Sequence, residues 1–262
     1  MALVLEAVTL KNGADSVLGS VYTYTSTLVK ASGNDRLVVV ISSGRSGAAR
    51  VITSFTASSA GTNYNTVDAD GGNAVSTAVG YFIDSELPAS AGSHDIDVEW
   101  SSTFLHESAI ILEFSGADQT TSLENWASNT GTDIAEAGTI AATLAGASGE
   151  FGVSYLSITD DASYSTPDAS TPPSGFTSQG AASEVTNLIH VATDTSVASA
   201  SEVLTWTLGA MGTSPYTSVV TGDLSVKAAA AAGGRIMSAL AGSGGLAYLG
   251  GLAGRGGGLA GR

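Results

Sequence analysis

The sequence predicts an all-β protein: an antiparallel β-sandwich of jelly-roll type over residues 1–226, followed by a Gly-rich C-terminal extension. Three observations predict this fold class. Short stretches rich in Val, Ile, Thr, Tyr and Phe recur along the chain, separated by Gly, Ser, Asn and Asp, as in strands and turns. Several stretches alternate between apolar and polar residues, which is the periodicity of a half-buried strand. Few windows have the apolar spacing of a helix.

The individual strands can be placed from these stretches. In residues 94–100, apolar residues that would face inward alternate with acidic residues. Residues 36–43 and 108–116 contain continuous apolar runs, which are typical of strands buried on both faces. Short helical turns are expected at 121–128 and 227–234. The candidate strands are 3–10, 20–29, 36–43, 50–57, 74–84, 94–102, 108–116, 150–159, 184–193, 202–209 and 216–226.

The acidic and basic residues are separated along the chain. The formal net charge is -15, and residues 51–226 contain 21 of the 24 acidic residues and no Lys or Arg. Residues 227–262 reverse this pattern, with four basic residues and no acid. Proteins bind nucleic acid largely by neutralising phosphates, so the acidic body is not expected to bind nucleic acid. The basic C-terminal segment is instead expected to dock on an acidic surface.

The sequence contains neither a cysteine nor a candidate membrane span. Without Cys, the chain has no disulfide, thiolate metal ligand or Cys nucleophile. Its apolar runs are shorter than the roughly 18 residues of a membrane-spanning helix. The N-terminus lacks the basic and apolar regions of a signal peptide. We therefore expect a protein that is made in a cytoplasm and reaches its destination by assembly or lysis.

The predicted domains are a β-sandwich body at 1–226 and an Ala/Gly-rich assembly tail at 227–262. The segment 165–175 contains three of the five prolines and is expected to form an extended, exposed loop. This loop could separate two subdomains, although a long loop within one sandwich of two stacked sheets is the simpler interpretation. No convincing sequence duplication is found within the body.

No sequence pattern supports catalysis or a cofactor. The serines lack the G-x-S-x-G arrangement of a hydrolase nucleophile, and the glycines of the tail lack the Lys-Ser/Thr of a phosphate-binding loop. Asp68, Asp70 and Asn73 are weak candidates for calcium ligands; an ordinary turn is favoured because the other ligands of a calcium loop are missing. Trp126 follows a predicted loop and is the candidate for an exposed aromatic contact to a ligand such as a sugar.

One stretch resembles a family of phage and prophage structural proteins. It contains NDRLVVVISSG at 34–44 and, at the end of a later strand, FSGADQTTSL at 114–123. The second motif has the form F-x-G-x-D-Q-T-T-x-L. The resemblance covers residues 32–128 and departs from the family at Ser122, where Pro is often found. It implies a β-sandwich module of virion decoration proteins, head fibres, tail fibres and adhesins, with no catalytic residues to transfer.

Two parts of the chain have predicted structural roles. Asp118 and Gln119 are expected to cap a turn and to hold the strand exit through bonds from side chain to backbone. The tail, which repeats GGLA at 244–247, 250–253 and 257–260, resembles the Gly-rich termini of phage structural proteins. Its Gly residues permit close backbone approach. The candidate assembly residues of the tail are Lys227, Arg235, Leu240, Leu246, Leu249, Leu252, Arg255, Leu259 and Arg262.

Together these observations predict a non-enzymatic virion structural protein of a bacteriophage, without a cofactor, assembled in the host cytoplasm. The first interpretation is a capsid-surface decoration protein or head fibre whose terminal segment docks on the major capsid or tail protein. The resemblance implies a homo-oligomer, with a trimer as the expected form. The alternative is a tail fibre or a receptor- or carbohydrate-binding adhesin that contacts a host-surface glycan through 60–73 and 160–183. A bacterial surface-layer or matrix subunit is a third interpretation.

Overall fold

The computed structural model describes residues 2–14, 16–57, 59–69, 74–160, 169–210 and 215–230, and residues 2–229 form one compact unit. The tail beyond residue 230 lies outside the described residues. The short helix expected at 227–234 therefore falls mostly outside them as well. Within the compact unit, Ala228 forms an extended β-bridge with Ala117 rather than a helical turn.

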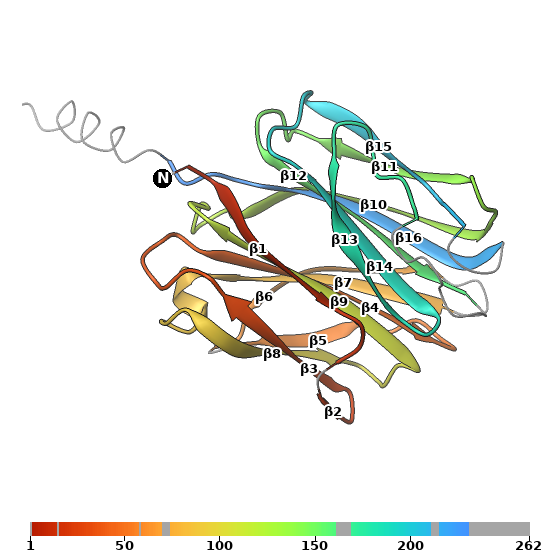
Figure 1. Cartoon of the computed structure of the whole chain (residues 1–262), viewed down its shortest axis with the longest axis horizontal. Helices are drawn as coiled ribbons and strands as arrows, with labels where there is room; N and C mark the ends of the chain where they lie inside the picture. The colour runs from red at the N-terminus through yellow and green to blue at the C-terminus, as the bar shows by residue number, and fades with distance from the viewer. Residues whose placement is uncertain are drawn as a thin grey trace, which may run out of the picture. The chain divides into compact units, whose positions relative to one another are not determined.

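The described secondary structure is almost entirely β (Figure 1). One short 3-10 helix, η1 (Asp84–Glu86), interrupts the strands of the described chain. The strands of the first half are β1 (Val4–Lys11), β2 (Ser16–Leu18), β3 (Val21–Leu28), β4 (Leu37–Ser46), β5 (Ile52–Thr56), β6 (Thr62–Ala69), β7 (Ala74–Ile83), β8 (Gly92–Trp100) and β9 (His106–Ser115). The strands of the second half are β10 (Leu123–Ile134), β11 (Thr139–Ala145), β12 (Phe151–Thr159), β13 (Thr177–Glu184), β14 (Asn187–Asp194), β15 (Ser201–Thr207) and β16 (Tyr216–Val226).

The first half of the chain forms a sandwich of two antiparallel sheets. One sheet has the strand order β1-β9-β4-β7-β6, and the other has the order β2-β3-β8-β5. The pairing is nested, because β1 pairs with β9, β3 with β8 and β4 with β7. Nested pairing arises when a long hairpin of strands wraps over itself into two sheets. This is the organisation of a jelly roll.

The second half repeats this organisation. Its sheets have the orders β10-β16-β12-β14-β13 and β11-β15. The nesting is also the same, because β10 pairs with β16, β11 with β15 and β12 with β14. Each strand of the second half therefore has a counterpart in the first half, and only β2 and β5 are extra.

The antiparallel, jelly-roll-like β-sandwich predicted from the sequence is confirmed, but the chain contains two such sandwiches rather than one pair of stacked sheets. They divide between β9 and β10, and the segment 165–175 lies instead within the second sandwich, in the connection from β12 to β13. The duplication is hidden in the sequence because the halves share strand order and burial rather than particular residues.

The two sandwiches pack through their five-stranded sheets (Figure 1). The contacts are reciprocal between the halves. β1 contacts β13, as its counterpart β10 contacts β6, and β9 contacts β14, as its counterpart β16 contacts β7. β4 and β14 likewise match β12 and β7. Exchanging the halves thus preserves the interface, as in the self-complementary contact of a twofold dimer.

Three apolar layers fill the spaces between the four sheets. On β4, Leu37, Val39 and Ile41 point into the central layer between the sandwiches, whereas Val38 and Val40 point into the core of the first sandwich. All five side chains are fully buried. The continuous apolar run is therefore explained as predicted, because a strand covered on both faces has no polar side.

The edge strands of both five-stranded sheets are irregular. One extra residue interrupts the pairing register of each edge strand, and such bulges bend an edge away from further strands. The two sheets are therefore poorly suited to extension by another chain. The interruptions lie between Leu5 and Ala7 in β1, Asn63 and Asn65 in β6, Glu124 and Ala127 in β10, and Ser178 and Gly180 in β13.

Every strand predicted from the sequence is present, with ends that differ by a few residues. The helical turn predicted at 121–128 is wrong, because β10 begins at Leu123. The strands β2, β6, β10, β11 and β13 were not predicted. Strand β13 shows why: its sequence, TSQGAASE, has few β-branched residues and is held in the sheet by pairing with β14.

Candidate functional site

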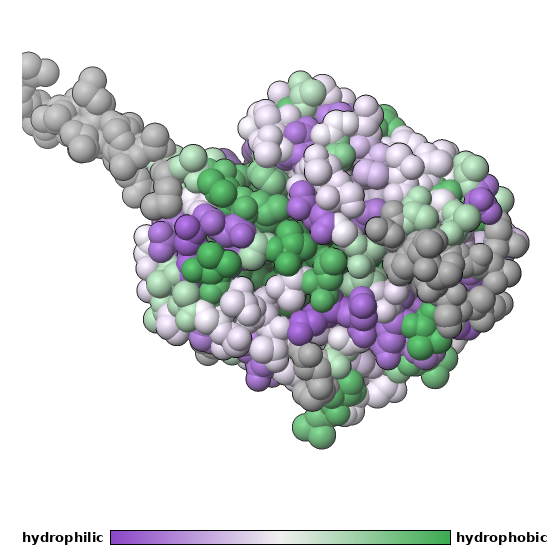
Figure 2. Space-filling view, in the orientation of Figure 1, coloured by the Kyte–Doolittle hydropathy of each residue, from purple (hydrophilic) through white to green (hydrophobic). Residues whose placement is uncertain are grey.

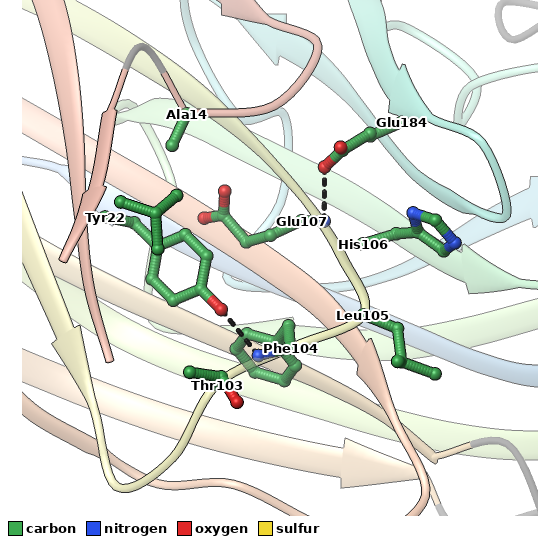
Figure 3. A pocket seen from close by; sticks show the side chains of 9 residues that line it. Ala14, Tyr22, Thr103, Phe104, Leu105, His106, Glu107 and Glu184 are labelled. Atoms are coloured by element: carbon green, nitrogen blue, oxygen red, sulfur yellow. Dashed lines mark hydrogen bonds between the residues drawn. The ribbon is translucent and has the colours of Figure 1, made fainter. Parts of the chain in front are cut away.

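The strongest candidate site is a pocket beside the start of β9, which we call the Glu107 pocket (Figure 3). Its volume is about 200 Å³. Its lining includes Tyr22 of β3, Phe104 just before β9, His106 and Glu107 of β9, and Glu184 of β13. The pocket therefore draws side chains from both sandwiches.

Glu107 is the most unusual of these residues. It lies on the face of β9 that points into the first sandwich, and its side chain is 1% exposed. The Ser42 hydroxyl donates to Oε1 at 2.6 Å, whereas Oε2 makes no hydrogen bond within the described part of the chain. Figure 3 shows the carboxyl group directed between Ala14 and the Tyr22 ring. Burial, and secondarily the charge of Glu184, raises the pKa of Glu107 well above its usual range.

Glu184 brings the second sandwich to the pocket. Its Oε2 accepts the backbone N–H of Glu107 at 2.8 Å. Nearby, the Asn12 side chain accepts the backbone N–H of Ser183 at 2.9 Å. Gly13 has a φ of 101°, and the Glu184 carboxyl occupies the space beside it. A side chain at residue 13 would therefore be strained and would press on Glu184.

Aromatic side chains form one wall of the pocket. The Phe104 backbone N–H donates to the Tyr22 hydroxyl oxygen, and the two ring centroids lie 6.0 Å apart. The Phe104 ring also stands edge-on to Trp100 at 4.8 Å. Burial is the main cause that raises the pKa of Tyr22. The wall is thus fixed by packing and by a backbone contact.

The outer rim of the pocket is apolar and exposed. Val17 is 54% exposed and Leu105 is 70% exposed, and Leu18, next to Val17 at the tip of β2, is 83% exposed. Figure 2 shows apolar surface at the position of β2. His106 adds a polar atom, because its Nδ1 is buried without a hydrogen bond in the described chain. A rim of this kind leaves apolar surface available for contact.

The chemistry of the pocket favours a cationic or hydrogen-bond-donating group over an anion. Two glutamates line it, and its described lining includes no Lys or Arg. One carboxyl oxygen of each glutamate is bound to the protein, Oε1 of Glu107 by Ser42 and Oε2 of Glu184 by a backbone amide. The other oxygen of Glu107 is available to a ligand.

Asp118 occupies a turn after β9. Its Oδ1 accepts the backbone N–H groups of Thr120 at 2.8 Å and Thr121 at 3.0 Å, and the Thr120 hydroxyl at 2.6 Å. These bonds, first the Thr120 hydroxyl and then the two amides, lower the pKa of Asp118 to about 2. The side chain therefore caps the turn.

Gln119 links this turn to two other segments. Its Nε2 donates to the carbonyl oxygens of Arg36 and Ala117, each at 3.1 Å, and its Oε1 accepts the Asp84 backbone N–H at 2.8 Å. The fully buried Arg36 guanidinium forms an ion pair with Asp84 at 2.5 Å and also donates to the Pro88 carbonyl. The motifs at 34–44 and 114–123 are thus in contact, and their polar residues hold the strand ends together.

The other predicted site residues do not gather at one place. Trp126 is half-buried, packs against the central core and lies 5.9 Å from the Tyr155 ring, so it does not form an exposed platform. The side chain of Asp68, like Asp70 and Asn73, lies outside the described residues. The same is true of Arg235, Leu240, Leu246, Leu249, Leu252, Arg255, Leu259 and Arg262.

Lys227 belongs to the body rather than to the tail. Its backbone N–H donates to the Ser122 carbonyl at 3.0 Å, and its carbonyl accepts the Asp118 N–H at 2.9 Å. Its ammonium group lies 3.0 Å from Glu124, which is the main cause that raises the pKa of Lys227. The ordered body therefore extends past residue 226 to Ala229.

The second sandwich contains another unusual acid, Asp223 of β16. Its side chain is fully buried, and neither carboxyl oxygen makes a hydrogen bond within the described residues. Ser154 lies opposite Asp223 on the neighbouring strand β12. The Ser154 hydroxyl oxygen accepts the Trp206 indole N–H at 2.8 Å. Burial raises the pKa of Asp223 to about 7, against a smaller lowering effect of Ser154. Asp223 does not line the Glu107 pocket, and we treat it as part of the core.

Sequence reasoning did not single out Glu107 or Glu184. The available signal was that Glu107 is a charged residue directly before the apolar strand 108–116. Strands buried on both faces seldom carry charge, so an acid at this position is unusual. Glu184 gave no such signal, because it ends a strand of ordinary polarity. The two glutamates are 77 residues apart in the sequence, and only the packing of the two sandwiches brings them together.

Among the residues that the structure describes, no group of three or more His, Asp or Glu side chains could hold a metal ion. None of the described helices is long and apolar enough to cross a membrane. Comparison of the chain with models of protein families, with curated proteins and with solved structures finds no match.

Proposed function

We propose that the chain is a non-enzymatic structural protein of a bacteriophage virion, a decoration protein of the capsid surface or a head fibre. In this proposal the acidic double jelly roll faces solvent, and the basic tail beyond Ala229 docks on the major capsid or tail protein. The protein would be assembled into the virion in the host cytoplasm, as a homo-oligomer and in the expected case a trimer.

The separation of charge along the chain carries this proposal. Residues 51–226 contain 21 of 24 acids and no Lys or Arg, and the tail beyond Ala229 contains three basic residues and no acid. Like charges on the bodies oppose non-specific association of copies, while a short basic segment is attracted to an acidic surface. A protein divided in this way is suited to attachment by one end.

Two features of the fold support the proposal. The bulged edges of both five-stranded sheets disfavour strand addition, so copies can stand close together on a particle without polymerising through their sheets. The polar residues of the phage-like motifs hold backbone segments in place, which is a structural role.

Limited trypsin digestion of the purified protein beside particles that contain it tests the proposal, with intact mass as the readout. Residues 51–226 offer trypsin no cleavage site because they contain no Lys or Arg. We expect cleavage after Arg235 or Arg255 in the free protein and protection of these sites in the particle. Equal cleavage in both samples would contradict anchoring through the tail.

Two further measurements address the particle and the oligomer. Particles that lack the protein should lose surface density or stability. Light scattering on the full chain should give three times the 25.9 kDa mass of one chain if the trimer forms in solution. A monomer at all concentrations would contradict the oligomeric part of the proposal.

The alternative is a tail fibre or a receptor- or carbohydrate-binding adhesin, and the Glu107 pocket with its exposed rim is the observation that favours it. Trp126, the candidate aromatic contact, is half-buried against the central core and is not part of the Glu107 pocket. Screening the full chain against an array of bacterial surface glycans separates the two proposals, because the decoration protein predicts no specific glycan binding.

A further inference from the structure

We propose that the Glu107 pocket binds the cationic end of an arginine or lysine side chain presented by a partner protein. This inference goes beyond the proposed virion function and does not depend on it. It rests on unsatisfied polar atoms, on the charge of the lining and on the shape of the rim.

Two buried polar atoms at the pocket lack hydrogen bonds in the described chain, Oε2 of Glu107 and Nδ1 of His106. Buried polar groups in proteins are nearly always satisfied, so an unsatisfied group calls for an explanation. Here both atoms belong to residues that line the same pocket of about 200 Å³. Glu107 as a whole is 1% exposed. A bound group that donates a hydrogen bond would satisfy its Oε2 atom.

The charges at the pocket select a cation. After burial, the charge of Glu184 is the second cause that raises the pKa of Glu107, so the two carboxyl groups lie close enough to interact. Arg45, which pairs with His106 across the strands, donates instead to the Asp160 carbonyl at 2.9 Å and to Thr186. A guanidinium or ammonium group between the glutamates would relieve their repulsion through charge-assisted hydrogen bonds. The neighbouring rings of Tyr22 and Phe104 can add cation–π contacts.

The rim indicates that the cation belongs to a protein. Val17, Leu18 and Leu105 are between 54% and 83% exposed around or beside the opening. A buried polar anchor surrounded by apolar contacts that exclude water is the usual anatomy of an interaction hot spot. A free inorganic cation would not use this apolar surface, whereas residues flanking an Arg or Lys would cover it.

Cation binding has a predictable pH dependence. The titratable groups beside the Glu107 carboxyl are Glu184 from β13 and Tyr22 from β3, with Arg50 acting on Tyr22. His106 lines the same pocket, but its ring lies on the other side of β9 (Figure 3). Burial raises the pKa of Glu107 well above its usual range, which favours its neutral form in the empty pocket. A cation binds best to the ionised form, so binding releases a proton and the apparent affinity rises with pH. A neutral ligand that accepts the Glu107 proton would show the opposite dependence.

The test uses the full chain and two probes of the same shape, N-acetyl-arginine amide and its neutral isostere N-acetyl-citrulline amide. Binding is followed by shifts of backbone amide NMR signals during titration, at several pH values. We expect the arginine probe to shift signals near Phe104, Glu107 and Glu184, with an affinity at least tenfold above that of the citrulline probe. N-acetyl-lysine amide should behave as the arginine probe does.

Three variants complete the test. Glu107→Gln and Glu184→Gln should each weaken binding of the arginine probe at least tenfold, whereas Glu136→Gln, at an exposed position, should leave it unchanged. The NMR spectra themselves show whether each variant is folded. Equal binding of the arginine and citrulline probes, unchanged affinity in both pocket variants, or an affinity that falls as pH rises would each overturn the proposal.

Discussion

Two glutamates on the same face of β9 differ in how the fold satisfies them. Glu113 is 2% exposed, and its two carboxylate oxygens accept the backbone N–H groups of Val29 at 2.6 Å and Lys30 at 3.0 Å. Glu107 is equally buried, but only one of its oxygens has a partner in the described chain. Both positions interrupt an otherwise apolar strand, so burial alone does not distinguish them.

The difference lies in what surrounds each end of the strand. The segment after β3 presents two free backbone amides to Glu113, which makes this carboxylate part of the structure. At the other end, Glu107 meets the aromatic wall of a pocket and a second carboxylate. We infer that a buried acid with complete partners serves the fold, and that one with incomplete partners beside a cavity is available for binding.

The largest expected effect comes from Asp223, a buried acid whose two carboxyl oxygens make no hydrogen bond within the described part of the chain. Its folded-state pKa of about 7 exceeds the ordinary value of 3.8. The stability from its protonation is therefore fully present below about pH 4 and is lost as the pH rises through 7. Asp223→Asn should stabilise the protein by up to about 4 kcal/mol at pH 8 and by almost nothing at pH 4. Urea unfolding at both pH values measures this, and equal effects at the two would refute the assignment.

Glu113→Gln tests the satisfied acid. The amide NH₂ group of Gln would face one of the two backbone donors, leaving it unpaired in the core. We expect a loss of about 2–3 kcal/mol at pH 7, measured by urea unfolding. Glu136→Gln on the surface is the matched control and should lie within about 0.5 kcal/mol of the parent. A Glu113 variant as stable as this control would break the comparison.

Glu107→Gln should have the opposite sign. Burial favours the neutral form of Glu107, and the isosteric amide of Gln is neutral at every pH and can still accept from Ser42. The raised pKa means that the parent loses stability as the pH rises above the range in which unfolded glutamates ionise. The variant should therefore be more stable than the parent at pH 8, by no more than about 2 kcal/mol, and similar at pH 4. Destabilisation at both pH values would show that the Glu107 carboxylate, like that of Glu113, stabilises the fold.

The smallest effect is expected at Asp118, which is satisfied by amides as Glu113 is but lies nearer to solvent. Its pKa of about 2 means that its stabilisation is present above the ordinary value of 3.8 and is lost as the pH falls through 2. Asp118→Ala should cost about 1 kcal/mol at pH 7, as loss of a cap does. Thermal unfolding of this variant and of Glu113→Gln compares the two losses of stability. A larger loss at Asp118, which has three hydrogen-bond donors but is less buried, would show that the number of donors matters more than burial.

The sequence predicted the fold class well because periodicity is local. The runs at 37–41 and 109–112 identified the central strands, since both of their faces are covered. The strands β10 and β13 could not be identified in this way, because their Gly, Ser and Asn residues resemble loops and only their sheet partners hold them extended.

The candidate site was harder to predict for a related reason. Asp118 and Gln119 act within a turn and on neighbouring strand ends, and their motif marked them. The pocket depends on Glu184 meeting Glu107 across the interface of two sandwiches whose duplication is not visible in the residues. Partners so far apart in the chain leave no spacing pattern, so only the packed structure places them together.

The course of β9 also fixes an orientation. At its end, Gly116 has a φ of 72° and lies directly against Ala2, and its carbonyl accepts the Ala229 N–H at 2.8 Å. Both ends of the compact body thus meet at one pole. Glu107 lies nine residues earlier on the extended chain, about 30 Å away at roughly 3.3 Å per residue. The Glu107 pocket therefore lies at the end of β9 opposite to the pole where Ala2 and Ala229 meet.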